Sequence, residues 1–106
     1  MVLHNIVSEK YLADINYPVN TGKTVRYLDV AIIDKKFDFE YDGKYFHDSK
    51  KDLIRDNELK DIGWIVYHVR GWNEIDFVRD NLDKIMKGGE SQGVDAMSLV
   101  ASRVKV

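Results

Sequence analysis

Two strand-like segments separated by only three residues impose the strongest constraint on this fold. Residues 25–33, "VRYLDVAII", are β-branched, aromatic and largely apolar, which is typical of a strand. "DKK" follows, and residues 37–42, "FDFEYD", alternate aromatic and acidic side chains. A connection this short joins antiparallel neighbours, so the two segments predict a β-hairpin that closes around residues 34–36.

The other segments predict helices on both sides of this hairpin. Asp48 or Ser49 can cap a helix that stops before Gly63. Before the hairpin we expect a helix over residues 3–14 and a loop over 14–24, which contains the only proline. After the hairpin we expect a helix over 48–62, a strand over 64–69 and a helix over 73–86. The buried stripe of this last helix is predicted to be Ile75, Val78, Leu82 and Ile85. This order predicts a mixed α/β fold with one small mixed β-sheet flanked by helices.

The last segment differs in composition from the rest. Residues 87–93, "KGGESQG", have the composition of a flexible joint. We therefore expect one domain over residues 1–87, and a joint with a C-terminal segment over 88–106. That apolar segment could pair two chains into a homodimer, or dock on its own domain.

Composition excludes several classes of site. The chain of 106 residues has no cysteine, so disulfides and thiolate metal sites are excluded. No apolar run approaches the roughly 18 residues of a membrane span, and the start lacks the pattern of a secretory signal, so we expect a cytoplasmic protein. The net charge of −2 argues against a strongly basic nucleic-acid binder, unless it hides a cluster of acids that a bound cation neutralises.

Two carboxylates of the hairpin are candidates for such a cluster. Asp29 lies between Leu28 and Val30, where an unpaired carboxylate is costly to bury. If the hairpin closes as predicted, Glu40 can lie near Asp29 across the ladder. Paired carboxylates suit magnesium or calcium, with water completing the shell. The alternative for Glu40 is an ordinary solvated strand face.

One histidine stands out from the other two. His47 is surrounded in sequence by carboxylates, which can hold an imidazole for general acid/base work, whereas His4 and His68 are interpreted as structural or exposed. Asp56 shares helical spacing with apolar residues and is expected beside the core-facing stripe. An ion pair with Lys60 is the alternative for Asp56.

Basic residues accompany these acids. Lys50, Lys51 and Arg55 belong to the predicted helix over 48–62, and Lys44 precedes it. All four can contact phosphates of DNA, although interleaved acids also fit a solvated helix face.

The run from "RYLDVAII" through "FDFEYDGKYFHD" to "IRDNELKDIGWIVYHV" resembles the very-short-patch-repair type of endonuclease domain, a branch of the PD-(D/E)xK superfamily. The likeness covers roughly residues 5–86. It is most similar to the phage homing endonucleases described by the motif EDxHD, which join such a domain to a separate DNA-binding region. The resemblance implies a restriction-endonuclease-like fold, a divalent-metal-dependent DNA endonuclease working in a bacterial host cell, and a fused DNA-binding domain outside this chain.

The resemblance also assigns roles to individual residues. It makes Asp29 the principal metal ligand, with Glu40 as the acid of the (D/E)xK motif, for Mg²⁺ or Mn²⁺. His47 becomes the general base or acid, and Asp56 its orienting carboxylate. Glu9 becomes a helix acid that acts through water on the metal shell. The implied catalytic set is Glu9, Asp29, Glu40, His47 and Asp56, and the implied metal ligands are Asp29, Glu40 and Asp42.

The sequence departs from the superfamily pattern at one critical position. The lysine expected two residues after Glu40 is replaced by Asp42, which can bind the metal or polarise a water instead. The missing lysine favours His47 as the proton-transfer group. It also supports a rival interpretation, a non-catalytic nucleic-acid-binding module with the same fold. A nuclease acting on RNA, a restriction-type enzyme and a plain structural domain are further alternatives.

Overall fold

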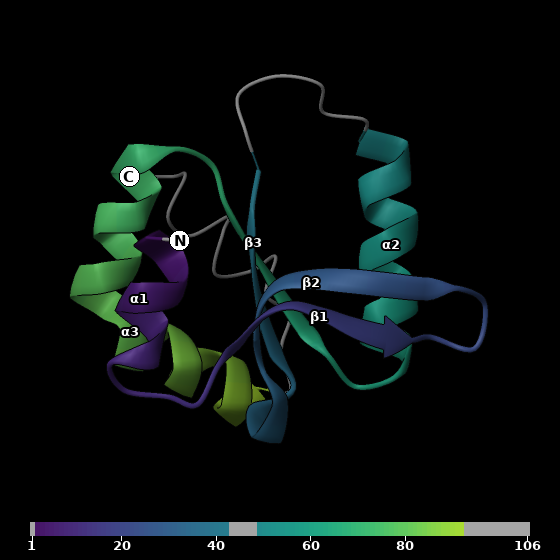
Figure 1. The fold of residues 1–106 in the computed structure, drawn as a ribbon, viewed down its shortest axis with the longest axis horizontal. Coiled ribbons are helices and arrows are strands. Elements are labelled where there is room, and N and C mark those ends of the chain that lie inside the picture. The colour runs from purple at the N-terminus through teal and green to yellow at the C-terminus, as the bar shows by residue number, and fades with distance from the viewer. Residues whose placement is uncertain (1, 43–48, 93–106) are drawn as a thin grey trace.

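The computed structural model describes residues 2–42 and 49–92, which form one mixed sheet between helices. Helices α1 (Val2–Ser8) and α3 (Trp72–Gln92) cover one face, and helix α2 (Ser49–Asp61) covers the other, as Figure 1 shows. The four strands lie in the order β1-β2-β3-β4, where β1 is Asp14–Asn20, β2 is Val25–Ile32, β3 is Phe37–Tyr41 and β4 is Ile65–Val69. The predicted fold class, a small mixed sheet flanked by helices, is confirmed.

The predicted hairpin is the pair β2 and β3. The two strands are antiparallel, with Ile32 opposite Phe37, and a short helical turn over Ile33–Lys35 joins them. Lys36 closes this turn with a φ of 49°, in the left-handed region. Strand β4 then pairs with β3 in parallel, which makes the sheet mixed.

The predicted loop over 14–24 is wrong, because most of it is strand β1. This strand lies at the edge of the sheet and pairs only with β2. An edge strand tolerates a proline, since the missing N–H can face solvent, and Pro18 lies opposite Tyr27 in this ladder. A turn closed by the Thr21 N–H on the Thr24 carbonyl oxygen at 2.9 Å separates β1 from β2.

The helix boundaries differ from prediction at both ends of the chain. Helix α1 ends at Ser8, so the expected helix over 3–14 is too long. Helix α3 continues to Gln92, past residue 88, where the joint was expected to begin. The two glycines lower helix propensity by about 1 kcal/mol each relative to alanine. A helix whose earlier turns are already stabilised by packing can continue through them. Residues 93–106 lie outside the described part of the chain.

The sheet separates two apolar clusters. The first lies against α1 and α3 and includes Phe37 and Phe39, with ring centroids 4.9 Å apart. All four residues of the predicted α3 stripe are buried in it. The second cluster is smaller and lies against α2, where Leu28, Leu59 and Trp64 meet. Strand β3 therefore presents its aromatic residues to the first cluster and its acids to the side of α2.

Helix α2 ends as the sequence predicts. Gly63 has a φ of 92°, a conformation that side chains with a Cβ rarely adopt. The Gly63 N–H donates to the Lys60 carbonyl oxygen at 3.0 Å, and the Trp64 N–H donates to that of Leu59 at 3.0 Å. These bonds satisfy the last carbonyls of the helix and direct the chain into β4.

A search for membrane-spanning helices among residues 2–42 and 49–92 finds no helix with the required length and apolar character.

Candidate functional site

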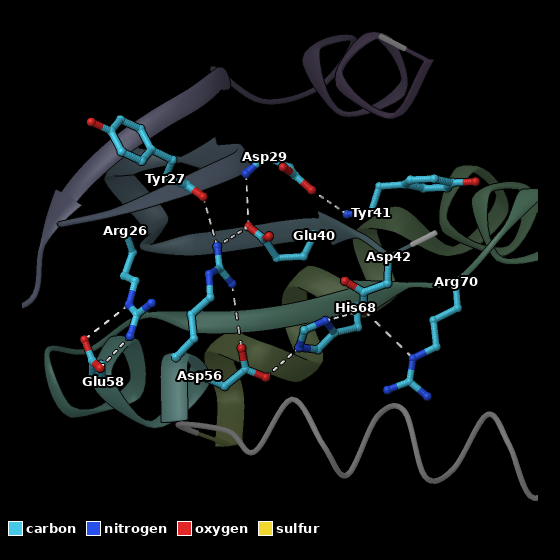
Figure 2. A network of polar contacts seen from close by, with 11 residues as sticks. Arg26, Tyr27, Asp29, Glu40, Tyr41, Asp42, Asp56, Glu58, His68 and Arg70 are labelled. Carbon is cyan, nitrogen blue, oxygen red and sulfur yellow. Dashed lines mark hydrogen bonds and ion pairs between the residues drawn. The ribbon is translucent and has the colours of Figure 1, made fainter. Parts of the chain in front are cut away.

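Strands β2 and β3 separate at the carboxylates of Asp29 and Glu40. Their last paired residues are Val30 and Phe39. Beyond that pair, side-chain oxygens take the place of main-chain acceptors. The Asp29 N–H donates to Glu40 Oε2 at 3.0 Å, and the Tyr41 N–H donates to Asp29 Oδ2 at 2.8 Å. Two acids from different strands are thus held side by side, as Figure 2 shows.

The local backbone explains why Asp29 occupies this position. Leu28 packs in the cluster under α2 and Val30 in the cluster under α1 and α3, although residues two apart in a regular strand share a face. The alternation therefore breaks at Asp29. Asn16, which lies at the same level of the neighbouring strand β1, has a φ of 50°. Both strands are irregular here, as they are at bulges beside functional sites.

The paired acids carry more negative charge than their surroundings neutralise. Asp29 is half-buried, and this burial raises its pKa above the ordinary value. The neighbouring charge of Glu40 raises the pKa of Asp29 further, whereas the hydrogen bond from Tyr41 and the guanidinium of Arg55 lower it. An additional cation at this position would be stabilised by both carboxylates.

Asp38 is a third acid on the same face of β3. Its side chain is 0% exposed, and neither oxygen has a hydrogen-bond partner among the described residues. Burial raises the pKa of Asp38 well above its ordinary value, and the neighbouring carboxylate of Glu40 raises it further. We infer that Asp38 is neutral, because a buried carboxylate without a partner is costly to ionise.

The guanidinium of Arg55, from helix α2, reaches across to these acids. Its Nη2 lies 3.0 Å from Glu40 Oε2 and donates to the carbonyl oxygen of Tyr27 at 3.0 Å. Its Nη1 lies 3.8 Å from Asp56 Oδ1. Burial by itself lowers the pKa of Arg55, but the ion pair with Glu40 raises it above the ordinary value, so the guanidinium stays charged.

A second group of charges adjoins the first. His68 of β4 lies between two carboxylates, with Nδ1 2.6 Å from Asp42 Oδ2 and Nε2 2.5 Å from Asp56 Oδ2 (Figure 2). Burial opposes the charge of this imidazole, but the hydrogen bonds with Asp42 and Asp56 raise the pKa of His68 from 6.5 to about 10. The side chain is therefore an imidazolium at neutral pH. It ties β4 to the end of β3 and to α2.

The contacts form one continuous network across the four elements β2, β3, α2 and β4. Asp29 touches Glu40, Glu40 touches Arg55, and Arg55 approaches Asp56, which binds His68. Arg70 lies at its outer edge, with Nε 3.9 Å from Asp42 Oδ2. The acids of the network are Asp29, Asp38, Glu40, Asp42 and Asp56, and the cations are Arg55, His68 and Arg70.

The structure brings together some of the predicted residues and not others. Asp29, Glu40, Asp56 and Arg55 meet in the network, as does Asp42. Glu9 is exposed and lies one residue beyond the end of α1, so its predicted place within a helix is wrong. Lys50 and Lys51 are exposed on the first turn of α2. His47 and Lys44 lie outside the described residues.

Asp56 binds an imidazole that was not predicted. The resemblance makes Asp56 the orienting carboxylate of His47, which lies outside the described residues, and the structure shows Asp56 Oδ2 bound to His68. Its other oxygen, Oδ1, is buried and has no hydrogen-bond partner in the described part of the chain. The expected ion pair partner Lys60 is exposed. Asp56 is thus fixed by His68 and retains one acceptor.

Of the predicted metal ligands, Asp29 and Glu40 form the pair that could hold a hard divalent cation. Within residues 2–42 and 49–92, no three side chains of the His, Cys, Asp and Glu types are gathered as a metal-binding group, so Asp29, Glu40 and Asp42 do not form one ligand set. Asp42 instead binds His68. Magnesium is commonly held by one or two carboxylates plus water and substrate phosphates. Asp29 and Glu40, with their excess negative charge, match that mode.

Sequence reasoning missed His68 and Asp38. The signal for His68 was the parallel register of β3 and β4, which places it beside Glu40 on the face toward α2. That register cannot be read from either strand alone. The signal for Asp38 was the strict alternation in β3, which puts Asp38 and Glu40 on one face. A solvated face was the alternative for Glu40, but α2 covers this face.

Comparison with known proteins gives no further guide to the site. No protein-family model matches this chain, and no curated protein or solved structure matches it either. Function must therefore be argued from the residues and their geometry.

Proposed function

We propose that this chain is the catalytic domain of a divalent-metal-dependent DNA endonuclease that hydrolyses phosphodiester bonds, as part of a homing endonuclease acting in the cytoplasm of a bacterial host. The observation that carries the proposal is the meeting of Asp29 and Glu40 where β2 and β3 separate. The half-buried Asp29 and the buried Glu40 lie beside the guanidinium of Arg55 and the acid-bound imidazolium of His68. The motif resemblance supports the same conclusion independently.

In this proposal Asp29 and Glu40 hold Mg²⁺ or Mn²⁺. The ion supplies Lewis-acid polarisation of a phosphate oxygen. Neutral Asp38 is buried on the same face of β3 as Glu40 and adds no negative charge beside the pair. Each of the paired acids is also fixed by a main-chain N–H or by Arg55, which preorganises the pair.

His47 is the proposed proton-transfer group. The imidazolium of His68 has too high a pKa, about 10, to exchange protons readily near neutral pH. His68 instead holds Asp56, the carboxylate that the resemblance makes the partner of His47. His47 then takes a proton from the attacking water or gives one to the leaving oxygen.

DNA is the proposed substrate, and Lys50, Lys51 and Lys44 are its proposed phosphate contacts. Affinity for DNA depends mainly on phosphate neutralisation, and the net charge of this chain is −2. We therefore propose that this domain binds weakly by itself and that a fused domain supplies the target specificity.

Nicking of supercoiled plasmid in Mg²⁺ or Mn²⁺ tests the proposal. Asp29→Ala, Glu40→Gln and His47→Ala should each lower the rate at least about a hundredfold, since each removes a group that acts on the reacting phosphate. Asp76→Asn is the matched control, because this acid of α3 has a side chain 67% exposed and pairs with Arg79 one turn away on the same helix. Cleavage that survives in purified Asp29→Ala and His47→Ala would reject the site. Competition between plasmid and single-stranded RNA identifies the preferred nucleic acid.

One observation favours a second candidate, a nucleic-acid-binding module without catalysis. Asp29 and Glu40 already satisfy main-chain N–H groups, and Arg55 already neutralises Glu40, so the acids also have a structural use. Metal-independent DNA binding without any nicking in Mg²⁺ or Mn²⁺ would support this alternative.

A further inference from the structure

The guanidinium of Arg55 lies beside the carboxylate of Glu40, where a positive charge is stabilised. Its Nη2 lies 3.0 Å from Glu40 Oε2, which is the same oxygen that accepts from the Asp29 N–H. The side chain of Arg55 is 18% exposed and that of Glu40 is 10% exposed. A charge pair this sheltered is little screened by salt.

Two further contacts hold the guanidinium in place. The Nη2 group also donates to the carbonyl oxygen of Tyr27 on β2, and Nη1 faces Asp56 at 3.8 Å. The bond to Tyr27 does not involve a carboxylate. It can therefore persist when Glu40 turns to another cation, and it keeps Arg55 beside the acids.

We propose that Arg55 is a resident counter-ion of the Asp29–Glu40 pair, which competes with a divalent cation for Glu40 and thereby sets the metal affinity of the site. This inference rests on the proposed function. A dication bound by the pair either shares Glu40 with the guanidinium or displaces it, and like charges at this separation repel in both cases. The displaced guanidinium has planar donors suited to two oxygens of a phosphate.

The proposal makes Arg55 different from an ordinary stabilising salt bridge. Removal of a purely structural ion pair should lower both the stability of the fold and the metal affinity of the site. Removal of a competing cation should tighten metal binding, even where it also lowers the stability of the fold. The sign of the change in metal affinity therefore separates the two roles.

Calorimetric titration of the full chain with Mn²⁺ tests this sign. Arg55→Gln removes the charge but keeps an amide that can donate to Tyr27, and it should bind Mn²⁺ at least about fivefold more tightly than the wild type. Arg55→Lys keeps the charge but lacks the second nitrogen with which the guanidinium faces Asp56, so its charge should be held less firmly beside Glu40 and Mn²⁺ should bind about twofold more tightly. Arg79→Gln, which removes an exposed arginine on α3, should leave the affinity unchanged.

The outcomes also separate this inference from the function on which it rests. Mn²⁺ binding by the wild type that disappears in Asp29→Asn and in Glu40→Gln supports the metal pair. If that result is obtained but Arg55→Gln binds Mn²⁺ equally or more weakly, the counter-ion proposal alone is overturned. Circular dichroism verifies that each variant folds, and if Arg55→Gln does not, an unchanged or weaker affinity in Arg55→Lys overturns it instead. A wild type that neither binds Mn²⁺ nor nicks DNA overturns both proposals.

Discussion

The imidazole of His68 and the carboxylate of Asp56 meet at 2.5 Å between Nε2 and Oδ2, and they join strand β4 to helix α2. Asp42 binds the opposite ring nitrogen at 2.6 Å. One side chain thus connects three elements, and it does so as a cation between two anions. Because Asp56 also approaches Arg55, the position of His68 affects the geometry around Glu40.

Replacing His68 by alanine should destabilise the fold strongly. The variant leaves Asp42 and Asp56 facing each other without their shared cation, and breaking a buried charge pair in this way costs about 3 kcal/mol of unfolding free energy. Urea denaturation measures the change. Asp76→Asn is the control, since its exposed side chain should matter little. A His68→Ala variant as stable as the wild type would show that the two carboxylates do not need this imidazolium.

The stability of the protein should fall in alkaline solution. The folded pKa of His68 is raised from 6.5 to about 10, so the folded state holds a proton that the unfolded state releases. This contribution is complete below pH 6.5 and is lost as pH rises toward 10. Denaturation midpoints at pH 6 and pH 9.5 measure it, with His68→Asn as the control that lacks the titrating group. An equal loss of stability in both proteins would assign the effect to other groups.

Substitution of Asp38 by asparagine should stabilise the protein at pH 7. The pKa of Asp38 is raised well above its ordinary value, by burial first and then by Glu40, so the folded state binds a proton that the unfolded state lacks. Stability from this group therefore decreases as pH rises above the unfolded pKa. Asparagine is uncharged at every pH and avoids that loss, which is worth on the order of 1 kcal/mol. Thermal unfolding at pH 5 and pH 7 should show the gain mainly at pH 7, and a variant less stable than wild type at pH 7 would contradict a neutral Asp38.

The central hairpin was predictable because its signals are local. Alternation in 37–42 and the short connection before it determine both the strand and its antiparallel partner, and this placed Asp29 beside Glu40 as expected. Gly63 likewise marked the end of α2. Each of these signals depends on neighbours in sequence, which an isolated segment already contains.

The errors arise where distant segments decide the outcome. Strand β1 was missed because Pro18 and Gly22 resemble loop residues until the edge position of the strand is known. His68 was missed because its two partners come from β3 and α2. Asp56 was expected beside a core-facing stripe of apolar residues, yet Leu53, three residues before it, is 60% exposed. Only the packing of α2 against the sheet determines which of its residues face the site.

The salt dependence of DNA binding should reveal the role of the basic turn of α2. Lys50 and Lys51 are exposed at its start, on the helix that carries Arg55 into the network. If both bind phosphates, the double variant Lys50→Gln/Lys51→Gln should bind weakly to any duplex sequence, and the slope of log affinity against log salt should fall by about 0.9 for each phosphate that is no longer neutralised. Fluorescence anisotropy with a labelled duplex in Ca²⁺ measures the slope without cleavage. Lys84→Gln, an exposed lysine on α3, is the control for net charge. An equal change of slope in Lys84→Gln would mean that the overall charge of the protein, and not this turn, determines binding.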